Sequence, residues 1–198
     1  MTEHPKFKDL QILLKAARMD LLVDWEGPVY RCVSPKWAHP DVLVDGKGSF
    51  KTGSRWMRPG VSPAVYAATS ELIALKESRR TVDHFGIPSP KKNAPRMIVQ
   101  LDAKLEGVAD LCQMDAILPW PTQSELLAEN WESQNEAGRE TLAQAFGRAL
   151  FALKLKGLII PSARDRRGRN LIWFPENFEK SDQITIVGKD ELENWIAR

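Results

Sequence analysis

Apolar residues recur at helical spacing in two long segments of the chain. The first predicts an amphipathic helix from about residue 9, with an apolar face made of Leu10, Leu13, Leu14 and Ala17. The second predicts a helix that Gly157 follows and ends, with a stripe made of Leu142, Ala145, Phe146, Ala149, Leu150 and Leu153. Shorter helices are predicted from a cap at Thr69 or Ser70 to about residue 81, within 118–130, and over 190–196.

Alternation of apolar and polar residues predicts short strands between these helices. The segments with this pattern are 28–34, 65–67, 97–101, 158–160, 171–174 and 183–187. The long connection 39–63 is rich in Gly, Pro, Ser and Asp and is predicted to be irregular, and 88–95 reads as a surface loop. Because the strands are short and the connections irregular, we predict a single mixed α+β domain rather than a doubly wound sheet.

Composition narrows the class of protein. The 198 residues include 43% hydrophobic and 27% charged residues, the balance of a globular chain rather than a disordered one. No apolar run is long enough to span a bilayer, and the first residues lack the apolar core of a secretory signal. The two cysteines, Cys32 and Cys112, could form at most one bridge. We therefore expect a cytoplasmic protein with no membrane partner.

Charge and motifs exclude several kinds of chemistry. With 28 Lys and Arg against 26 Asp and Glu, the net charge of +2 does not favour a nucleic-acid-binding domain. The three histidines, His4, His39 and His84, and the absence of CxxC and HExxH leave no ligand set for zinc, so we predict no metal. Phosphate-loop motifs are also missing. The chemistry must therefore use Arg, Glu, Ser and Tyr.

Four blocks of sequence together resemble the RES-domain family, which is named for its Arg, Glu and Ser. They are Tyr30-Arg31, the loop GSRWMRPG (53–60) leading into VYAA, the segment ALKE (74–77), and GLIIPSAR with NLIWFPEN further on. One block alone would be weak evidence, but four in this order and at these separations are specific. The resemblance covers roughly residues 29–187.

The resemblance implies an α+β fold related to that of ADP-ribosyltransferases. It divides the single domain 1–198 into a helical extension (1–27), a RES core (28–188) and a C-terminal helix (189–198). It also implies a toxin-type enzyme that breaks the nicotinamide–ribose bond of NAD⁺, favouring phosphorolysis to nicotinamide and ADP-ribose 1″-phosphate. Inorganic phosphate would then be the co-substrate, with no permanently bound cofactor, and the expected partner is an Xre-like antitoxin.

The family's functional residues fall on matching positions of this chain. The resemblance implies catalytic roles for Arg31, Glu77 and Ser162, and NAD⁺ binding by Arg31, Arg55, Trp56 and Tyr66. Three positions depart from the family's usual Gly, Asn and Thr, namely Ser54, Met57 and Ala143. Gln144 and Gly147 keep the family pattern.

The side chains suit this reaction. Nicotinamide leaves NAD⁺ as a neutral molecule, so the barrier lies in positive charge developing on the ribose, which the carboxylate of Glu77 would stabilise. The guanidinium of Arg31, on the inner face of a strand, could grip the pyrophosphate in two places. The structural alternatives are that Glu77 is a solvated residue near a helix end and that Arg31 forms an internal salt bridge.

The other candidates also have structural alternatives. Arg55 could be an ordinary exposed loop arginine, and Trp56 is of a type found more often in the core than on a base. Tyr66 could stack on nicotinamide or simply pack. Ser162 could position ribose or the acceptor, or cap a turn, and without a GxSxG motif it is not expected to be a hydrolase nucleophile.

Three further functions remain open on the residues alone. They are hydrolysis of NAD⁺, transfer of ADP-ribose to a macromolecule, and a non-enzymatic module that binds nucleic acid or a partner. Binding of nucleic acid would use the cluster Arg164, Arg166, Arg167 and Arg169, for which a solvated turn is the favoured interpretation. Lys91 and Lys92 are interpreted as surface charge in the same way, and whether the chain forms a homodimer is left open.

Overall fold

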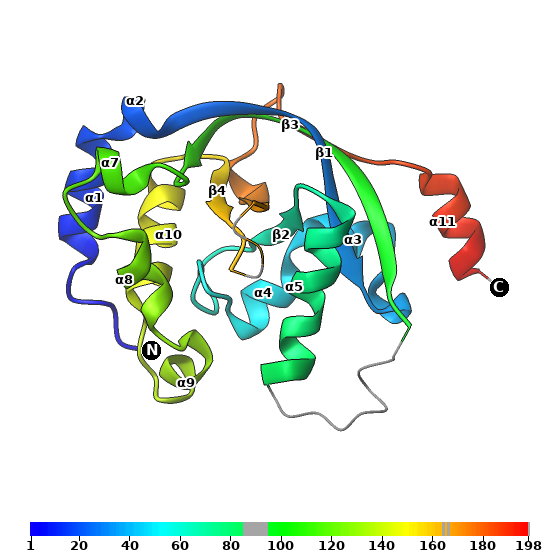
Figure 1. Cartoon of the computed structure of the whole chain (residues 1–198), viewed down its shortest axis with the longest axis horizontal. Helices are drawn as coiled ribbons and strands as arrows, with labels where there is room; N and C mark the ends of the chain where they lie inside the picture. The colour runs from blue at the N-terminus through cyan, green and yellow to red at the C-terminus, as the bar shows by residue number, and fades with distance from the viewer. Residues whose placement is uncertain (85–94, 164, 166, 198) are drawn as a thin grey trace.

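The computed structural model describes residues 1–84, 95–163, 165 and 167–197, with side chains of 79–84 excepted. Two long antiparallel strands, β1 (Leu22–Val33) and β3 (Met97–Asp110), arch across the molecule in Figure 1. The helices α1 (Phe7–Ala16), α8 (Gln123–Ala128) and α10 (Leu142–Ala152) lie on one side of the arch. Beneath its other end lie α3 (Pro40–Asp45), α4 (Lys47–Thr52) and α5 (Glu71–His84).

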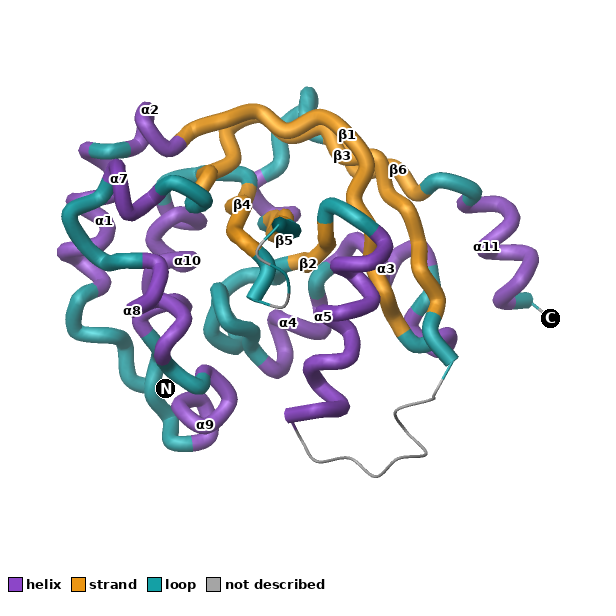
Figure 2. Tube along the Cα trace, in the orientation of Figure 1, coloured by secondary structure: helices purple, strands orange, loops and turns teal. Residues whose placement is uncertain are grey.

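The described strands form one sheet in the order β1-β2-β5-β4-β3-β6, and a further pairing of β1 with β3 closes the first five into a ring. The shorter strands are β2 (Val65–Ala68), β4 (Gly157–Pro161), β5 (Arg169–Trp173) and β6 (Gln183–Ile186). β4 runs parallel to β3, and the other pairings are antiparallel. Figure 2 shows the strands with helices around them, so the prediction of a mixed α+β fold is confirmed.

Strand β3 is nearly three times as long as the predicted strand 97–101. Leu101, Ala103 and Leu105 are buried, and the polar residues between them face solvent. Such alternation is what one buried face requires. The same alternation continues through Asp102, Lys104 and Glu106, so the prediction that this strand ends at 101 is wrong. β1 also begins six residues before the predicted start at 28, so the boundary between extension and core falls inside a strand.

The prediction that 39–63 is irregular is wrong for 40–52, whereas 53–63 contains no regular helix or strand. The segment from Ser34 contains the 3₁₀ turn η1 (Pro35–Trp37) and two short helices, α3 (Pro40–Asp45) and α4 (Lys47–Thr52). Gly46 separates the helices with φ +64°, a conformation that glycine adopts readily. Each helix has only six residues, too few to produce a helical repeat in the sequence.

The predicted helices are confirmed, but α10 ends at Ala152, five residues before Gly157, which begins β4. Helix α5 (Glu71–His84) follows Ser70, whose Oγ accepts the backbone N–H of Ile73. Helix α10 starts with a capping box between Thr141 and Gln144. The remaining helices are α2 (Arg18–Leu21), α7 (Met114–Ile117), α9 (Trp131–Glu136) and α11 (Lys189–Ile196). The predicted loop 88–95 lies outside the described residues except for Pro95.

Helix α10 is the centre of the largest apolar core. Its residues Phe146 and Leu150 pack with Leu10 and Leu14 of α1, so the N-terminal segment shares this core. Gly147 allows an unusually close approach, because a Cβ added there would overlap the carbonyl oxygen of Trp56. A second apolar cluster lies between β1, β3 and β5. None of the described helices has the length and apolar character needed to cross a membrane.

Candidate functional site

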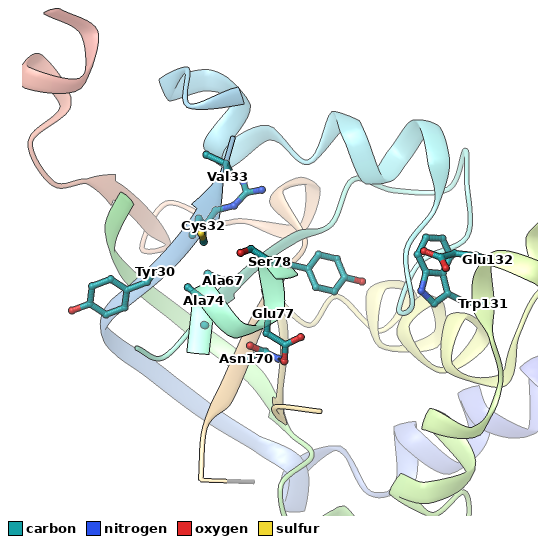
Figure 3. Close-up of a pocket in the computed structure, with 13 residues that line it drawn as sticks. Tyr30, Cys32, Val33, Ala67, Ala74, Glu77, Ser78, Trp131, Glu132 and Asn170 are labelled. Carbon is teal, nitrogen blue, oxygen red and sulfur yellow. The ribbon is translucent and has the colours of Figure 1, made fainter. Parts of the chain in front are cut away.

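A pocket of about 310 Å³ opens where β1, β2 and β5 meet helix α5 (Figure 3). Strand residues form its floor, Glu77 and Ser78 of α5 form one wall, and Trp131 and Glu132 of α9 lie opposite. The pocket therefore gathers residues that are far apart in the sequence. Its volume is within the range of small-molecule sites.

Glu77 is the carboxylate of this pocket, and one of its oxygens is fixed by two neutral donors. The Ser162 hydroxyl donates to Oε1 at 2.6 Å, and the Asn170 amide donates to the same oxygen at 3.0 Å. Among the described residues no group donates to Oε2. Glu77 is partly buried rather than a freely solvated helix residue. The arrangement holds the carboxylate in place without neutralising it with a cation.

Ser162 serves the turn and Glu77 together. It is 4% exposed directly after β4, and its Oγ also accepts the backbone N–H of Asp165 at 3.3 Å. Asp165 pairs with Lys76 of α5 at 2.7 Å, and this contact lowers the pKa of the Asp165 carboxyl. The turn after β4 is thus tied to the helix that carries Glu77, which fixes the two groups relative to each other.

Arg31 lies at the edge of the same pocket, and its positive charge is contacted by backbone carbonyls rather than by a carboxylate of the described residues. Its Nη1 donates to the carbonyl oxygens of Val42, at 3.4 Å, and Leu43 in helix α3. It forms no ion pair with a carboxylate of the described residues, so an internal salt bridge is not what holds it. Burial lowers the pKa of Arg31 to about 10, although the negative charge of Asp45 acts in the opposite direction. Such a group is suited to an anionic ligand.

A second pocket, of about 630 Å³, adjoins the first. The two share Arg31, Val33 and Tyr66 as lining residues. Most other lining residues of the second pocket come from η1, α3, α4 and the turn after α4, and Ser34, Ala64 and Arg96 complete it. All of these elements except η1 lie in the segment 39–63 that was predicted to be irregular. Arg31 and Tyr66 thus stand at the junction of two cavities.

The hydroxyl of Tyr66 is held by the loop 53–60, which carries Arg55 and Trp56. It donates to Ser54 Oγ at 2.7 Å and accepts the backbone N–H of Trp56 at 3.1 Å. Ser54 is one of the departures from the family pattern, and the usual glycine would have no hydroxyl to offer here. Gln144 holds the same loop through a 2.8 Å bond from Nε2 to the Ser54 carbonyl.

Arg55 and Trp56 are not among the residues that line the two pockets. Trp56 is 2% exposed and packs edge-on against Phe146, which confirms the core interpretation of this side chain. Arg55 donates from Nη1 to the carbonyls of Leu127, at 3.4 Å, and Glu129, at 3.2 Å, beside α8. Both residues fix the loop whose other atoms hold Tyr66.

Sequence reasoning gave no role to Asn170 or Trp131, which both line the pocket. Asn170 lies in the block NLIWFPEN, but no role was predicted for it. Trp131 follows a polar stretch and carries no motif, and it reaches the pocket only because α9 folds opposite α5. Of the predicted arginine cluster, Arg164 and Arg166 lie outside the described residues, as do Lys91 and Lys92. Arg167 has a side chain that is 94% exposed, in keeping with a solvated turn.

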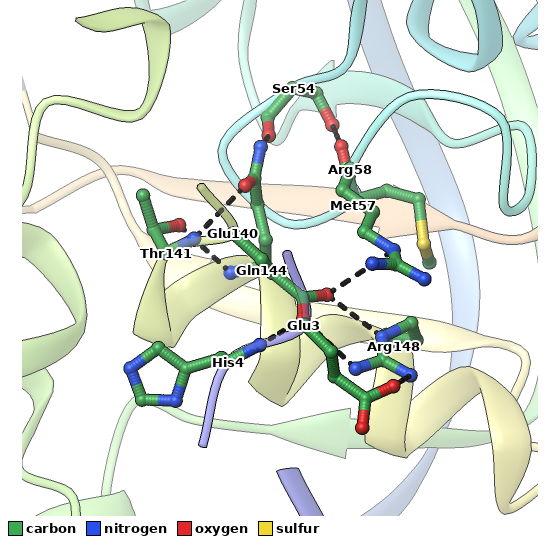
Figure 4. A network of polar contacts seen from close by, with 9 residues as sticks. All are labelled: Glu3, His4, Ser54, Met57, Arg58, Glu140, Thr141, Gln144 and Arg148. Carbon is green, nitrogen blue, oxygen red and sulfur yellow. Dashed lines mark hydrogen bonds and ion pairs between the residues drawn. The ribbon is translucent and has the colours of Figure 1, made fainter. Parts of the chain in front are cut away.

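A second group of charges lies away from both pockets, around the fully buried carboxylate of Glu140 (Figure 4). Arg148 contacts both oxygens of Glu140, at 2.8 and 2.9 Å, and the His4 backbone N–H donates to it at 2.8 Å. Arg58 lies 3.6 Å from the same group, and Glu3 pairs with Arg148 at 3.0 Å. This network joins the N-terminus, the loop 53–60 and helix α10.

Comparison with known proteins places the chain in a family. A family model described as RES domain matches residues 28–195. Relatives from Mycobacterium tuberculosis and Mycobacterium bovis named NAD(+) phosphorylase MbcT are 25% identical over 148 residues, which cover 71% of this chain and 70% of theirs. The crystal structure of the M. tuberculosis MbcT–MbcA toxin–antitoxin complex contains a similar fold, with a TM-score of 0.63 at 21% identity, covering 96% of this chain and 97% of that one. The chain belongs to the RES domain family.

Proposed function

We propose that this protein is an NAD⁺-degrading toxin that breaks the nicotinamide–ribose bond, with inorganic phosphate as the favoured acceptor. The observation that carries the proposal is the Glu77 carboxylate, fixed on one oxygen by Ser162 and Asn170 in a pocket that Arg31 borders. The MbcT relatives, which are named NAD(+) phosphorylases, support the same reaction.

In the proposed reaction the nicotinamide half of NAD⁺ occupies the pocket of Glu77. The C–N bond breaks and its electron pair stays on the nicotinamide nitrogen, so the leaving group departs neutral and needs no acid. Positive charge develops on the ribose, where the carboxylate of Glu77 stabilises the transition state more than the ground state. A phosphate oxygen then bonds to the same carbon, giving ADP-ribose 1″-phosphate.

Arg31 and Tyr66 have supporting roles in this proposal. Arg31 lies at the junction of the two cavities, where the pyrophosphate of a dinucleotide spanning them would pass. The guanidinium of Arg31 would bind the negatively charged pyrophosphate through charge-assisted hydrogen bonds. The ring of Tyr66 lines the same junction and would pack against the bound nucleotide, with its hydroxyl anchored on Ser54. Ser162 acts by positioning Glu77.

The test is mass spectrometry of NAD⁺ incubated with the purified protein in phosphate buffer. We expect nicotinamide and ADP-ribose 1″-phosphate, and we expect Glu77→Gln to lower turnover by at least about a hundredfold, the scale for losing a transition-state electrostatic contact. Glu71→Gln, the same change in the first turn of α5, is the matched control, because Glu71 is exposed and lines neither pocket, and it should keep most of the activity. Plain ADP-ribose as the product in phosphate would point to hydrolysis, and labelled protein or RNA would point to ADP-ribosyl transfer.

We also propose a protein antitoxin as partner. The structural neighbour was crystallised as a toxin–antitoxin complex, which supports such a partner for this chain. Expression of the wild type alone should arrest bacterial growth and deplete NAD⁺, whereas Glu77→Gln should do neither. Unimpaired growth and normal NAD⁺ at confirmed expression would contradict the toxin role.

A further inference from the structure

The second pocket is larger than the pocket of Glu77, and the proposed function names no ligand group inside it beyond the pyrophosphate at the junction. It is lined by η1, α3, α4 and the turn 53–54, and it meets the first pocket at Arg31 and Tyr66. A ligand that reaches from Glu77 past Arg31 would therefore continue into it. The chemistry of its walls indicates which part of that ligand it suits.

An exposed aromatic ring lies at this pocket. Trp37, the last residue of η1, lines the cavity and is 54% exposed. Leaving a tryptophan so exposed forgoes the burial that usually stabilises this residue. The ammonium of Lys36 lies 5.1 Å from the ring centroid. This cation lies over one face of the indole, and an exposed indole face is the kind of surface on which purine bases stack.

Polar groups of the pocket point in the same direction. Ser34 lines it, and its buried Oγ has no hydrogen-bond partner among the described residues. Such a hydroxyl gains free energy when a ligand supplies a partner. The charged lining residues beyond Arg31 are Arg96, Asp41, and Lys47 paired with Asp45 at 3.0 Å, so the positive charge available to a ligand lies at Arg31 and Arg96. The pocket thus offers a stacking surface, an unsatisfied hydroxyl and a cation.

From this geometry we infer that the second pocket binds the adenosine-phosphate half of the dinucleotide, with Trp37 stacking on the adenine. The inference rests on the proposed function for its direction, because Glu77 assigns the nicotinamide half to the first pocket. Trp37 is a binding and specificity residue here, remote from the bond that breaks. Its loss should weaken binding of any ligand that carries adenine and leave the chemical step unchanged.

The direct test is binding of AMP, measured by titration calorimetry on the whole protein, so that no turnover is needed. We expect AMP to bind the wild type and to bind Trp37→Ala about tenfold more weakly, the scale for losing one base–aromatic stack. Trp195→Ala is the matched control, since Trp195 is 48% exposed in α11 and does not line either pocket. It should bind AMP like the wild type.

Kinetics give the second readout. Trp37→Ala should raise KM for NAD⁺ about tenfold with kcat unchanged, and it should leave the use of nicotinamide mononucleotide, which lacks the adenosine half, unaltered. No AMP binding to the wild type, or equal binding to Trp37→Ala, overturns the inference. If AMP binds as expected but NAD⁺ is not consumed, the adenosine site stands and the proposed reaction falls. If NAD⁺ is consumed but Trp37→Ala binds AMP as well as the wild type does, the proposed reaction stands and the adenosine site falls.

Discussion

Two glutamates of this protein are fixed by hydrogen bonds in opposite ways. Glu77 receives two neutral donors on one oxygen and borders a pocket, whereas Glu140 is fully buried, with Arg148 on both oxygens and Arg58 close by. The donors of Glu77 orient its charge and leave it able to act on a ligand. The charge of Glu140 is neutralised by its partners, and these ion pairs hold three segments of the chain together.

The comparison separates a functional carboxylate from a structural one by what surrounds each. A buried ion pair stabilises the fold only if every partner is present, because removing one leaves the other charge buried and unpaired. When a carboxylate that is held by neutral donors at a pocket loses its charge, no buried cation is left unpaired, so the fold is not destabilised in this way. The substitutions below test whether the two roles are as distinct as the contacts indicate.

The largest expected effect on stability is that of Glu140→Gln. The change keeps the shape of the side chain but removes the buried negative charge that Arg148 contacts twice, and leaves Arg148 only the partly exposed Glu3 as a carboxylate, so we expect a loss of about 3–5 kcal/mol of folding free energy. For a chain of this size that corresponds to a fall in melting temperature of roughly 10 °C or more. Thermal melts by circular dichroism would measure it.

Glu77→Gln is the partner experiment to this one. It should melt within a few degrees of the wild type while losing NAD⁺ cleavage, and Glu140→Gln should keep cleavage at temperatures where it is folded. If the two variants lose the same stability, the distinction between the two carboxylates is wrong.

A second test removes no charge and concerns the close contact between the loop 53–60 and helix α10. In Gly147→Ala the new methyl group overlaps the Trp56 carbonyl, so the loop must move away from α10 at an expected cost of about 1–3 kcal/mol. The Trp56 N–H also holds the Tyr66 hydroxyl, and the shift should therefore raise KM for NAD⁺.

Gly48→Ala is the control for the glycine substitution, because nothing lies within 4 Å of a Cβ at that helical position. Urea unfolding should show it as stable as the wild type or slightly more so. An unaltered midpoint for Gly147→Ala would mean that the close approach of loop and helix is not needed.

A smaller effect is expected when Glu77 keeps its charge and loses one of its donors. Asn170→Ala removes the 3.0 Å bond to Oε1, while Ser162 still holds the same oxygen. We expect kcat to fall about tenfold with little change in KM, well short of the loss in Glu77→Gln. Steady-state kinetics on the pair would measure the split. A loss as large as that of Glu77→Gln would make Asn170 more than a positioning residue.

The regular parts of the fold could be predicted from the sequence because their patterns are long. Helix α10 has three turns of apolar stripe and a capping box, and each feature indicates the same element. Helices α3 and α4 have six residues each and could not be predicted from periodicity. That failure hid the second pocket, and it also hid the carbonyl partners of Arg31, since both belong to α3.

The site is a different case, because its residues meet only through the tertiary fold. Glu77 and Ser162 are 85 positions apart, and nothing local in the sequence indicates that they touch. The resemblance to a family named both residues, and the structure supplies the contact between them. Asn170 and Trp131 carried no signal strong enough to select them, and Trp56 was placed on the ligand where the structure places it in the core.

The smallest expected effect concerns a third carboxylate, Asp110, and the thiol beside it. Burial, together with the hydrogen bond and charge of Asp110, raises the pKa of Cys112 from 9.0 to about 12. The thiol therefore stays neutral in the folded protein where an unfolded chain would ionise it. This preference stabilises the fold fully below pH 9, and the stabilisation is lost as the pH rises from 9 toward 12.

Alkylation by iodoacetamide at pH 9, followed by mass spectrometry, measures this preference. In Cys32→Ser, which isolates Cys112, labelling should be at least about tenfold slower in the native protein than in urea, since the thiolate is the reactive form. Equal rates would show that Cys112 is open to solvent and ionised. In that case the charge of Asp110 would not keep the neighbouring thiol protonated. Asp110 would then be like Glu77, whose charge can act on a ligand, and unlike Glu140, whose charge only holds its neighbours in place.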